Sequence, residues 1–204
     1  EVHTLVAQLK DRLGTTCLGH PKVNKTAHLA VANARPGKRH HVLIFCVYKA
    51  TQKDLETAVT DVLATKGLTG KVRVAAPDDL TAAKPWLKRG FDREPNGDNT
   101  PIVLIVRDNL SESIDLDGGH PVVIHHDLSW SPVRWTQRMG RVVRASTAFK
   151  GPDPQDVHIP VLATDIDRRM YETLQGRGEL TDRVVPPNLK ALLEELLPDE
   201  DDTD

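Results

Sequence analysis

The stretch HVLIFCVYKATQKDLETAVTDVLATKG, residues 41–67, carries the strongest architectural signal in the chain. Its first eight residues are apolar on both faces and rich in β-branched and aromatic side chains, which predicts a parallel strand buried on both sides. Thr51 is predicted to cap the helix that follows, with Asp54 in the capping-box position. Gly67 is predicted to end this helix. The apolar stripe of the helix comprises Leu55, Ala58, Val59, Val62 and Leu63.

The same succession of strand and helix continues outward along the chain. Further strands are predicted at 71–76, 101–107, 121–127 and 157–162, and helices at about 23–33, 78–90, 132–145 and 164–177. Alternating strands and helices predict a three-layer αβα domain of the α/β class with a mostly parallel sheet. Such sheets bind ligands at the carboxyl ends of their strands, so we expect the chemistry just after residues 48, 107 and 127.

The composition is that of a globular protein without a bias toward one kind of partner. Of 204 residues, 39% are hydrophobic and 27% charged, and the formal net charge is -2. No stretch is apolar enough to span a bilayer, so we expect no membrane partner and a cytoplasmic location. Cys17 and Cys46 lack metal-binding spacing, which favours two reduced thiols. The chain starts without Met on an amphipathic, acid-containing segment, which favours an excised fragment over a signal peptide.

Residues 129–152 form a basic island that contains no Asp or Glu. On a helix Gln137, Arg141 and Arg144 share one face, because they are spaced at i, i+4 and i+7. Arg134 and Arg138 form the adjacent row. Two guanidinium groups directed at one place suit an anion whose charge grows in a transition state, as in phosphoryl transfer. The alternative is a solvated basic face with no ligand.

Residues 122–144, VVIHHDLSWSPVRWTQRMGRVVR, resemble the joined motifs V and VI of the Swi/Snf-type and RapA-like branch of superfamily 2 helicases. In that branch a strand runs into Asp-Leu-Pro-Trp-Asn-Pro and then Gln-Arg-x-Gly-Arg-x-x-Arg. Ser129 and Ser131 depart from this pattern. The residues that match it are Asp127, Leu128, Trp130, Pro132, Gln137, Arg138, Gly140, Arg141 and Arg144.

Other segments extend the resemblance over roughly residues 20–185. SESIDLDGG, residues 111–119, is similar to the Ser-Glu-Gly-Ile-Asn/Asp-Leu-Gln motif, with Ser113 in place of its glycine. Residues 42–56 are similar to motif IV, and residues 20–29 to the helix that precedes it. The resemblance implies a RecA-like lobe over 20–185. An N-terminal helix and linker would occupy 1–19, and a C-terminal helix and acidic tail 186–204.

The resemblance also implies a role for each matched residue. Arg141 and Arg144 would approach the γ-phosphate of ATP as arginine fingers, and Gln137 would couple the nucleotide state to lobe closure. Asp115, Glu112 and Gly140 would lie at the nucleotide. The nucleic-acid backbone would be contacted by Thr51, Ser111, Arg134 and Arg138.

The sequence contains no Walker A string, GxxxxGK[ST]. We therefore expect ATP and Mg²⁺ to be bound mainly by a first lobe absent from this chain, and we expect the isolated chain to be inactive. The expected partners are DNA, in duplex form, the N-terminal RecA-like lobe of the same parent protein, and other subunits of a complex. The expected function is that of the second motor lobe of an ATP-dependent helicase or translocase.

Three alternatives compete with the motor-lobe interpretation. Ser113 and the unusual stretch 67–100 favour a catalytically degenerate RecA-like scaffold that binds nucleic acid or protein. An unrelated Rossmann-like enzyme is disfavoured, because no GxGxxG follows a strand. A metal site at the histidine pairs 40–41 and 125–126 is disfavoured, because neighbouring residues of a strand point to opposite faces. We assign no metal ligand.

Overall fold

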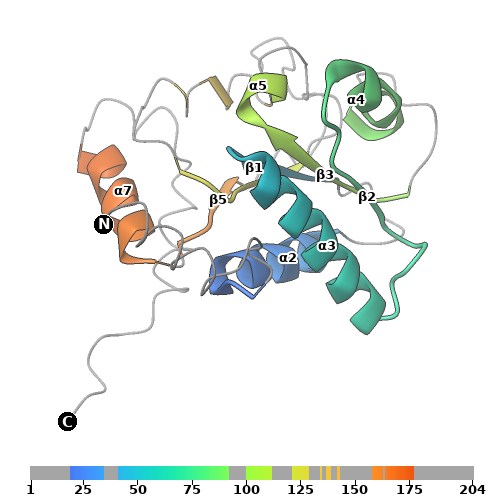
Figure 1. Cartoon of the computed structure of the whole chain (residues 1–204), viewed down its shortest axis with the longest axis horizontal. Coiled ribbons are helices and arrows are strands. Elements are labelled where there is room, and N and C mark those ends of the chain that lie inside the picture. Colours follow the sequence, from blue (N-terminus) through green and yellow to red (C-terminus); the bar gives the residue numbers. More distant parts are fainter. Residues whose placement is uncertain are drawn as a thin grey trace, which may run out of the picture.

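The computed structural model describes residues 19–34, 41–91, 100–111, 121–128, 134, 137–138, 142, 158–162 and 164–176. Within these ranges strands and helices alternate, as the sequence predicts (Figure 1). The strands are β1 (Val42–Cys46), β2 (Arg73–Ala75), β3 (Ile102–Arg107), β4 (Val122–His125) and β5 (His158–Pro160). The helices are α2 (Pro21–Asn33), α3 (Lys49–Thr65), α4 (Leu80–Trp86), a π-helical turn (Leu87–Phe91), α5 (Asp108–Ser111) and α7 (Asp165–Gly176).

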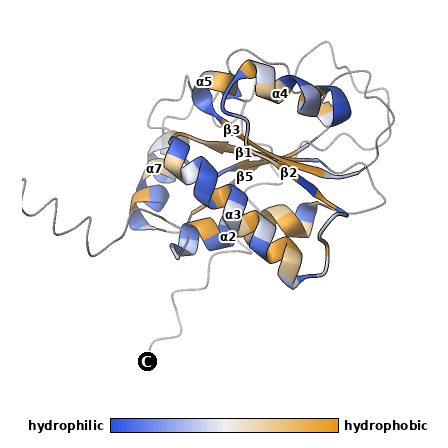
Figure 2. Ribbon diagram, turned by 45° about the vertical axis from the view of Figure 1, so that its right-hand side comes forward, coloured by the Kyte–Doolittle hydropathy of each residue, from blue (hydrophilic) through white to orange (hydrophobic). Residues whose placement is uncertain are grey.

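The five strands form one sheet in the order β2-β3-β1-β4-β5. All four pairings are parallel, with Val42 opposite both Val103 of β3 and Val122 of β4. In Figure 2 the sheet lies between α2 and α3 on one side and α4 and α5 on the other. The predicted α/β class with a parallel sheet and three layers is thereby confirmed.

The central strand β1 supplies both halves of the core. Its residues are fully buried, and their side chains alternate between the two faces of the sheet. Val42, Ile44 and Cys46 pack in the cluster that includes α2 and α3. Leu43 and Phe45 pack on the other side, with residues of α4, the π-helical turn and α5. This two-sided burial explains why the strand is a continuous apolar run.

Helix α3 begins earlier than the capping signal predicts. Tyr48 is the N-cap residue, with extended backbone and no side-chain cap, and the Gln52 N–H closes the first turn on the Tyr48 carbonyl. The prediction that Thr51 caps the helix is therefore wrong, because Thr51 already lies inside its first turn. The apolar stripe is confirmed, and Gly67 follows the helix at a φ of 65°, a conformation that favours glycine.

The predicted helix at 78–90 is shorter and irregular. Asp79 caps α4 by accepting a hydrogen bond from the Ala82 N–H at 2.8 Å. Pro85 lies inside the helix and has no N–H to donate. The chain then widens into the π-helical turn, which places Gly90 against the sheet. A Cβ at Gly90 would lie 2.9 Å from His41 Cε1 and 3.0 Å from Ile102 Cδ1.

The remaining predicted helices are described in part or not at all. The helix predicted at about 23–33 is confirmed as α2, and the one at 164–177 as α7. Of the helix predicted at 132–145, residues 134, 137, 138 and 142 are described, and all four are helical. The segments 1–18 and 177–204, with their predicted helices, lie outside the described residues. No helix within the described part is both long and apolar enough for a membrane span.

We expect Gly90→Ala to destabilise the domain by about 1–3 kcal/mol. The added methyl group meets the ring of His41, which is 1% exposed and cannot move aside. This strain exceeds the stabilisation of about 0.4–1 kcal/mol that a Gly→Ala change gives by lowering the conformational entropy of the unfolded chain. Urea unfolding of the two proteins measures the difference.

The matched control is Gly19→Ala, because a Cβ there meets nothing within 4 Å. Gly19→Ala should leave the unfolding midpoint unchanged or slightly raised. Equal stability of the two alanine variants would contradict the close packing assigned to the π-helical turn.

Candidate functional site at the carboxyl edge of the sheet

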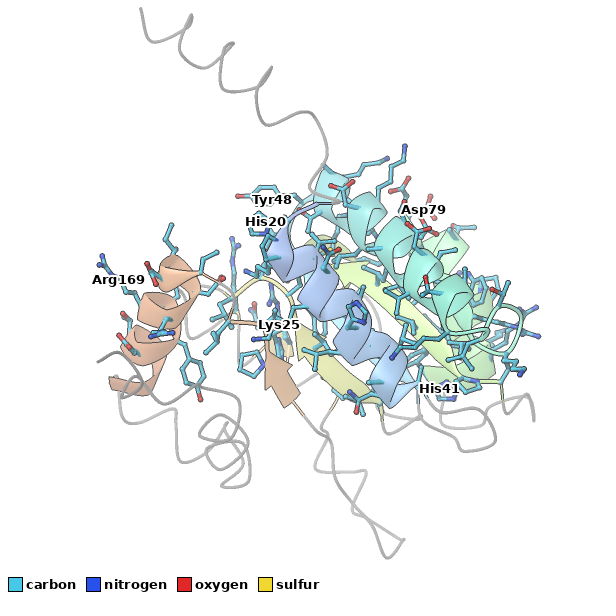
Figure 3. The ribbon with its side chains drawn as sticks, turned by 90° about the horizontal axis from the view of Figure 1, so that it is seen from below. His20, Lys25, His41, Tyr48, Asp79 and Arg169 are labelled. Carbon is cyan, nitrogen blue, oxygen red and sulfur yellow. The ribbon has the colours of Figure 1, made fainter. Side chains whose placement is uncertain are left out.

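The polar residues of the domain gather where the parallel strands end. Asp108 follows β3, Asp127 lies just beyond β4, and Tyr48 lies just beyond β1. Figure 3 shows His20 at the beginning of α2 and Tyr48 at the beginning of α3, both at the same end of the two helices in this view, with His41 at the opposite end of α2. The carboxyl edge is therefore bordered by helix N-termini, whose free N–H groups favour negative charge.

Asp127 connects the ends of β4 and β1. Its Oδ2 atom accepts a hydrogen bond from the Val47 N–H at 2.8 Å. Its Oδ1 atom lies 3.8 Å from Lys22 Nζ of α2. The carboxylate is thus engaged in fixing the chain at the point where β1 turns into α3.

Arg138 joins the described helical residues 134, 137, 138 and 142 to the same edge. Its Nε donates to Asp108 Oδ1 at 2.7 Å, and its Nη1 donates to the Asp127 carbonyl oxygen at 2.6 Å. The guanidinium carbon also lies 5.4 Å from the centre of the Phe45 ring, at cation–π distance. We call Arg138, Asp108 and Asp127 the Arg138 cluster.

The structure gives Arg138 a role different from the nucleic-acid contact predicted for it. The residue is 2% exposed, and its guanidinium already binds groups of its own domain. A buried arginine needs such partners, because desolvation of its charge is costly. Arg138 therefore positions its helix against the sheet edge, and its predicted contact with nucleic acid stays a prediction.

The other predicted site residues are placed unevenly. Arg134 and Gln137 are exposed, whereas Val142, four residues after Arg138, is buried in the core. Thr51 is half-buried in the first turn of α3, and Ser111 ends α5. The predicted residues outside the described part are Arg141, Arg144, Gly140, Glu112 and Asp115.

Gln52 is a structural residue of this edge that the sequence reasoning missed. Its buried amide Nε2 donates to the carbonyl oxygens of Pro77, at 3.1 Å, and Ile105, at 2.9 Å. It therefore connects α3 to β3 and to the segment after β2. Its position three residues before Leu55, on the inward stripe, is a signal that could have found it.

A second group of charges joins α7 to α2. Lys22 Nζ lies 2.5 Å from Asp167 Oδ1, and both side chains are largely buried. Asp167 Oδ2 also accepts hydrogen bonds from the Thr164 N–H, at 3.1 Å, and from the Thr164 hydroxyl, at 2.8 Å. Asp167 thus closes the capping arrangement of α7 and neutralises Lys22 at the same time.

The two histidines at the end of β4 lie on different faces of the sheet. His125 stacks on Phe45, with ring centres 5.7 Å apart, whereas His126 contacts Thr26 of α2. They therefore cannot hold one ion together. Within the described ranges, no group of three or more His, Cys, Asp or Glu side chains is arranged to hold a metal ion.

His126 is neutral at neutral pH. Burial lowers its pKa to about 4, and this effect outweighs the opposing influence of Asp127. The Thr26 hydroxyl donates to the Lys22 carbonyl oxygen and lies 2.8 Å from His126 Nδ1.

Cys46 is no candidate nucleophile. Burial, followed by the charge of Asp127, raises the pKa of its thiol to about 12. Its Sγ atom points at the Val106 carbonyl oxygen, 3.7 Å away. The thiol stays protonated near neutral pH and behaves as a small apolar residue.

A third charged group lies at the outer part of the edge. Lys49 Nζ lies 2.9 Å from Asp78 Oδ2, and Arg107 Nη2 donates to the Asp78 carbonyl oxygen at 2.9 Å. The hydrogen bond from Lys49 lowers the pKa of Asp78. Lys49 and Asp78 are exposed, so the group orients the loop before α4 and adds little stability.

We expect Arg138→Gln to destabilise the domain by about 3 kcal/mol, because Asp108 is left in a largely buried position without its cation. Urea unfolding measures the loss. The loss of unfolding free energy in the double variant Arg138→Gln, Asp108→Asn should be about 1–3 kcal/mol smaller than the sum of the losses in the two single variants.

Arg134→Gln is the matched control, because Arg134 is exposed on the same helical segment. It should change stability by less than ~0.5 kcal/mol. If Arg138→Gln cost no more than Arg134→Gln, the structural role of the Arg138 cluster would be refuted.

His126 makes stability fall as the solution becomes acidic. The unfolded chain takes up this proton near the ordinary histidine pKa of 6.5, whereas the folded protein resists it down to about 4. Between these values proton uptake favours unfolding. We therefore expect the free energy of unfolding to fall by about 2 kcal/mol from pH 7 to pH 5.

His126→Gln should reduce this pH dependence, measured as the difference in unfolding free energy between pH 7 and pH 5. His28→Gln, a change at an exposed position of α2, should retain it. An identical pH dependence of the wild-type and His126→Gln proteins would show that His126 does not resist protonation.

Comparison with known proteins identifies the family. Residues 22–146 match the family described as "Helicase conserved C-terminal domain". The match spans more than half of the chain and includes the Arg138 cluster. The chain belongs to the helicase conserved C-terminal domain family. No curated protein sequence matches the chain.

One solved structure supports this fold. The chain is similar to the C-terminal part of the Fun30 ATPase domain, with a TM-score of 0.51 and 20% identity over 86% of this chain and 52% of that one. It is also similar to the DUF1998 helicase MrfA bound to DNA, with a TM-score of 0.48 and 16% identity over 89% of this chain and 22% of that one. The chain thus spans about half of the first structure and a smaller part of the second.

Proposed function

We propose that this chain is the second motor lobe of an ATP-dependent DNA helicase or translocase, of the Swi/Snf-type or RapA-like branch of superfamily 2. Membership in the helicase C-terminal family supports the lobe assignment. The observation that carries the proposal is the Arg138 cluster, which fixes a helical segment of motif VI to the carboxyl edge of a parallel sheet. Ligands of parallel α/β sheets bind at that edge.

The orientation of the motif VI segment supports arginine fingers. Arg138 and Val142, four residues apart, are buried, and Gln137 is exposed. Helical spacing predicts that Arg141 and Arg144 share the face of Gln137. In the proposal their guanidinium groups are directed away from the domain, toward ATP on a facing lobe.

The proposed chemistry is hydrolysis of the γ-phosphate of ATP. The oxygen of a water molecule bonds to the γ-phosphorus while the bond to the bridging oxygen breaks, and that oxygen leaves with its electron pair on ADP. The proton that the water loses is released to solvent with the inorganic phosphate. Arg141 and Arg144 stabilise the negative charge of the transition state. Asp115, Glu112 and Gly140 are proposed to lie at the nucleotide, and Gln137 to connect it with lobe closure.

The residues that would hold Mg²⁺ and the phosphates are assigned to the facing lobe. The 204 residues contain no Walker A string. Among the described residues, no group of three or more His, Cys, Asp or Glu side chains is arranged to hold a metal ion. Mg²⁺ neutralises phosphate charge when bound, and this chain contributes the arginines from the opposite side.

The nucleic acid is proposed to follow the carboxyl edge. Arg134 is exposed one turn before Arg138, and α3 begins with no acidic residue in its first turn, so the N–H groups of α3 suit a phosphate. Thr51 lies in that turn, and Ser111 ends the neighbouring α5. We propose duplex DNA as the substrate, with the first lobe and further subunits of a complex as partners.

We expect Arg144→Ala to lower DNA-stimulated ATP turnover by about 10³-fold in the protein that carries both lobes. Steady-state phosphate release measures the effect. Arg169→Ala, at an exposed position of α7, is the control and should leave turnover within about twofold, because this residue is assigned no role at the nucleotide or the nucleic acid.

The 204-residue chain alone should release no phosphate above background. Rapid hydrolysis by this chain would overturn the assignment of the ATP site to a facing lobe. Full activity of Arg144→Ala would remove the finger role. An inactive two-lobe protein that still binds DNA would favour the degenerate scaffold that Ser113 suggests.

A further inference from the structure

Helix α4 and the π-helical turn carry positive charge without any negative charge. Residues 80–91, LTAAKPWLKRGF, contain three cations and no Asp or Glu. Lys84, Lys88 and Arg89 are all exposed, and none has an ion pair among the described residues. We call these three residues the α4 basic surface. In a chain of net charge -2 such a grouping is a local exception.

The α4 basic surface is attached firmly to the core. Ala83, Gly90 and Phe91 are buried on the sheet face opposite α2 and α3, and Trp86 and Leu87 pack partly against them (Figure 2). Gly90 approaches His41 so closely that a Cβ would not fit. The cations therefore project from a fixed support, which lowers the entropy lost when they bind a ligand.

Within the described part of the chain, Arg89 contacts the Trp86 ring and donates no hydrogen bond. Its guanidinium carbon lies 5.5 Å from the centre of the Trp86 ring, a cation–π contact. A salt bridge would occupy the donors, whereas stacking on a ring leaves them available. A guanidinium stacked on a ring can bind phosphate with its edge and a base with its open face.

Three other cations in the described part of the domain each contact a carboxylate. Lys49 and Arg107 contact Asp78, and Arg138 contacts Asp108. These groups are neutralised within the domain. The α4 basic surface has no acidic partner among the described residues, so there it keeps its attraction for a polyanion at physiological ionic strength.

We propose that the α4 basic surface is a second nucleic-acid contact, separate from the carboxyl edge. Lys84, Lys88 and Arg89 bind phosphates of the backbone, and the Arg89–Trp86 pair adds a stacking surface. The choice of nucleic acid as the polyanion rests on the proposed function. An acidic protein segment is the competing ligand, and a merely solvated face is the other outcome.

The test is the salt dependence of DNA binding by the 204-residue chain. Fluorescence anisotropy with a labelled 30-base-pair duplex gives the affinity over a series of salt concentrations. The variant Lys84→Gln, Lys88→Gln, Arg89→Gln should lower the slope of log affinity against log salt by about 2–3, since each phosphate contact contributes ~0.9. Its affinity at moderate salt should fall about tenfold or more.

The control variant Lys53→Gln, Lys66→Gln, Lys71→Gln removes the same charge from exposed positions elsewhere. It should leave the slope unchanged. Arg89→Lys keeps the charge and loses the planar stack, so it should weaken binding by about threefold without a change of slope.

An unchanged slope in the first triple variant, or an equal change in the control, would overturn the proposal. Tighter binding of a polyglutamate peptide than of duplex DNA through the same three residues would overturn it in favour of a protein partner. The Arg144→Ala assay is independent of these outcomes. If Arg144→Ala kept full ATP turnover while the first triple variant still lowered the salt slope, the motor-lobe proposal would be refuted and the α4 basic surface would stand.

Discussion

The hydrogen bond between Arg138 and Asp108 is the contact on which the arrangement of the candidate site depends. The sheet brings the ends of β3 and β4 to one edge, but it does not determine where the chain after β4 returns. Arg138 fixes this position by donating hydrogen bonds to the Asp108 carboxylate, which follows β3, and to the backbone carbonyl of Asp127, which follows β4. Its burial would be costly without the carboxylate, so the helical segment has one favourable position against the sheet.

Several polar residues repeat this arrangement along the same edge. The Asp127 carboxylate holds the first residue after β1, the Gln52 amide holds the segment after β2, and Asp167 holds Lys22 at the beginning of α2. Each bond joins segments that the parallel sheet has already brought together. The apolar core thus supplies the free energy of folding, and the polar edge supplies a defined geometry for ligands.

Much of the fold follows from local sequence patterns, whereas the contacts of the site do not. The continuous apolar run at β1 predicted a strand buried on both faces, and the stripe from Leu55 to Leu63 predicted the inward face of α3. The contact between Arg138 and Asp108 could not be read from the sequence, because the two residues lie 30 positions apart. Lys22 and Asp167 are 145 residues apart, and no periodicity connects them. Thr51 was taken for a cap because a capping signal does not show where the preceding strand ends.

The pairing of Lys22 with Asp167 bears on how the domain can be divided for expression. The family match ends at residue 146, which invites a fragment that stops there. Such a fragment would retain Lys22 in α2 and lose the carboxylate that neutralises it, together with the edge strand β5 that covers β4. A self-sufficient recombinant domain therefore has to extend through α7, to Gly176 or beyond.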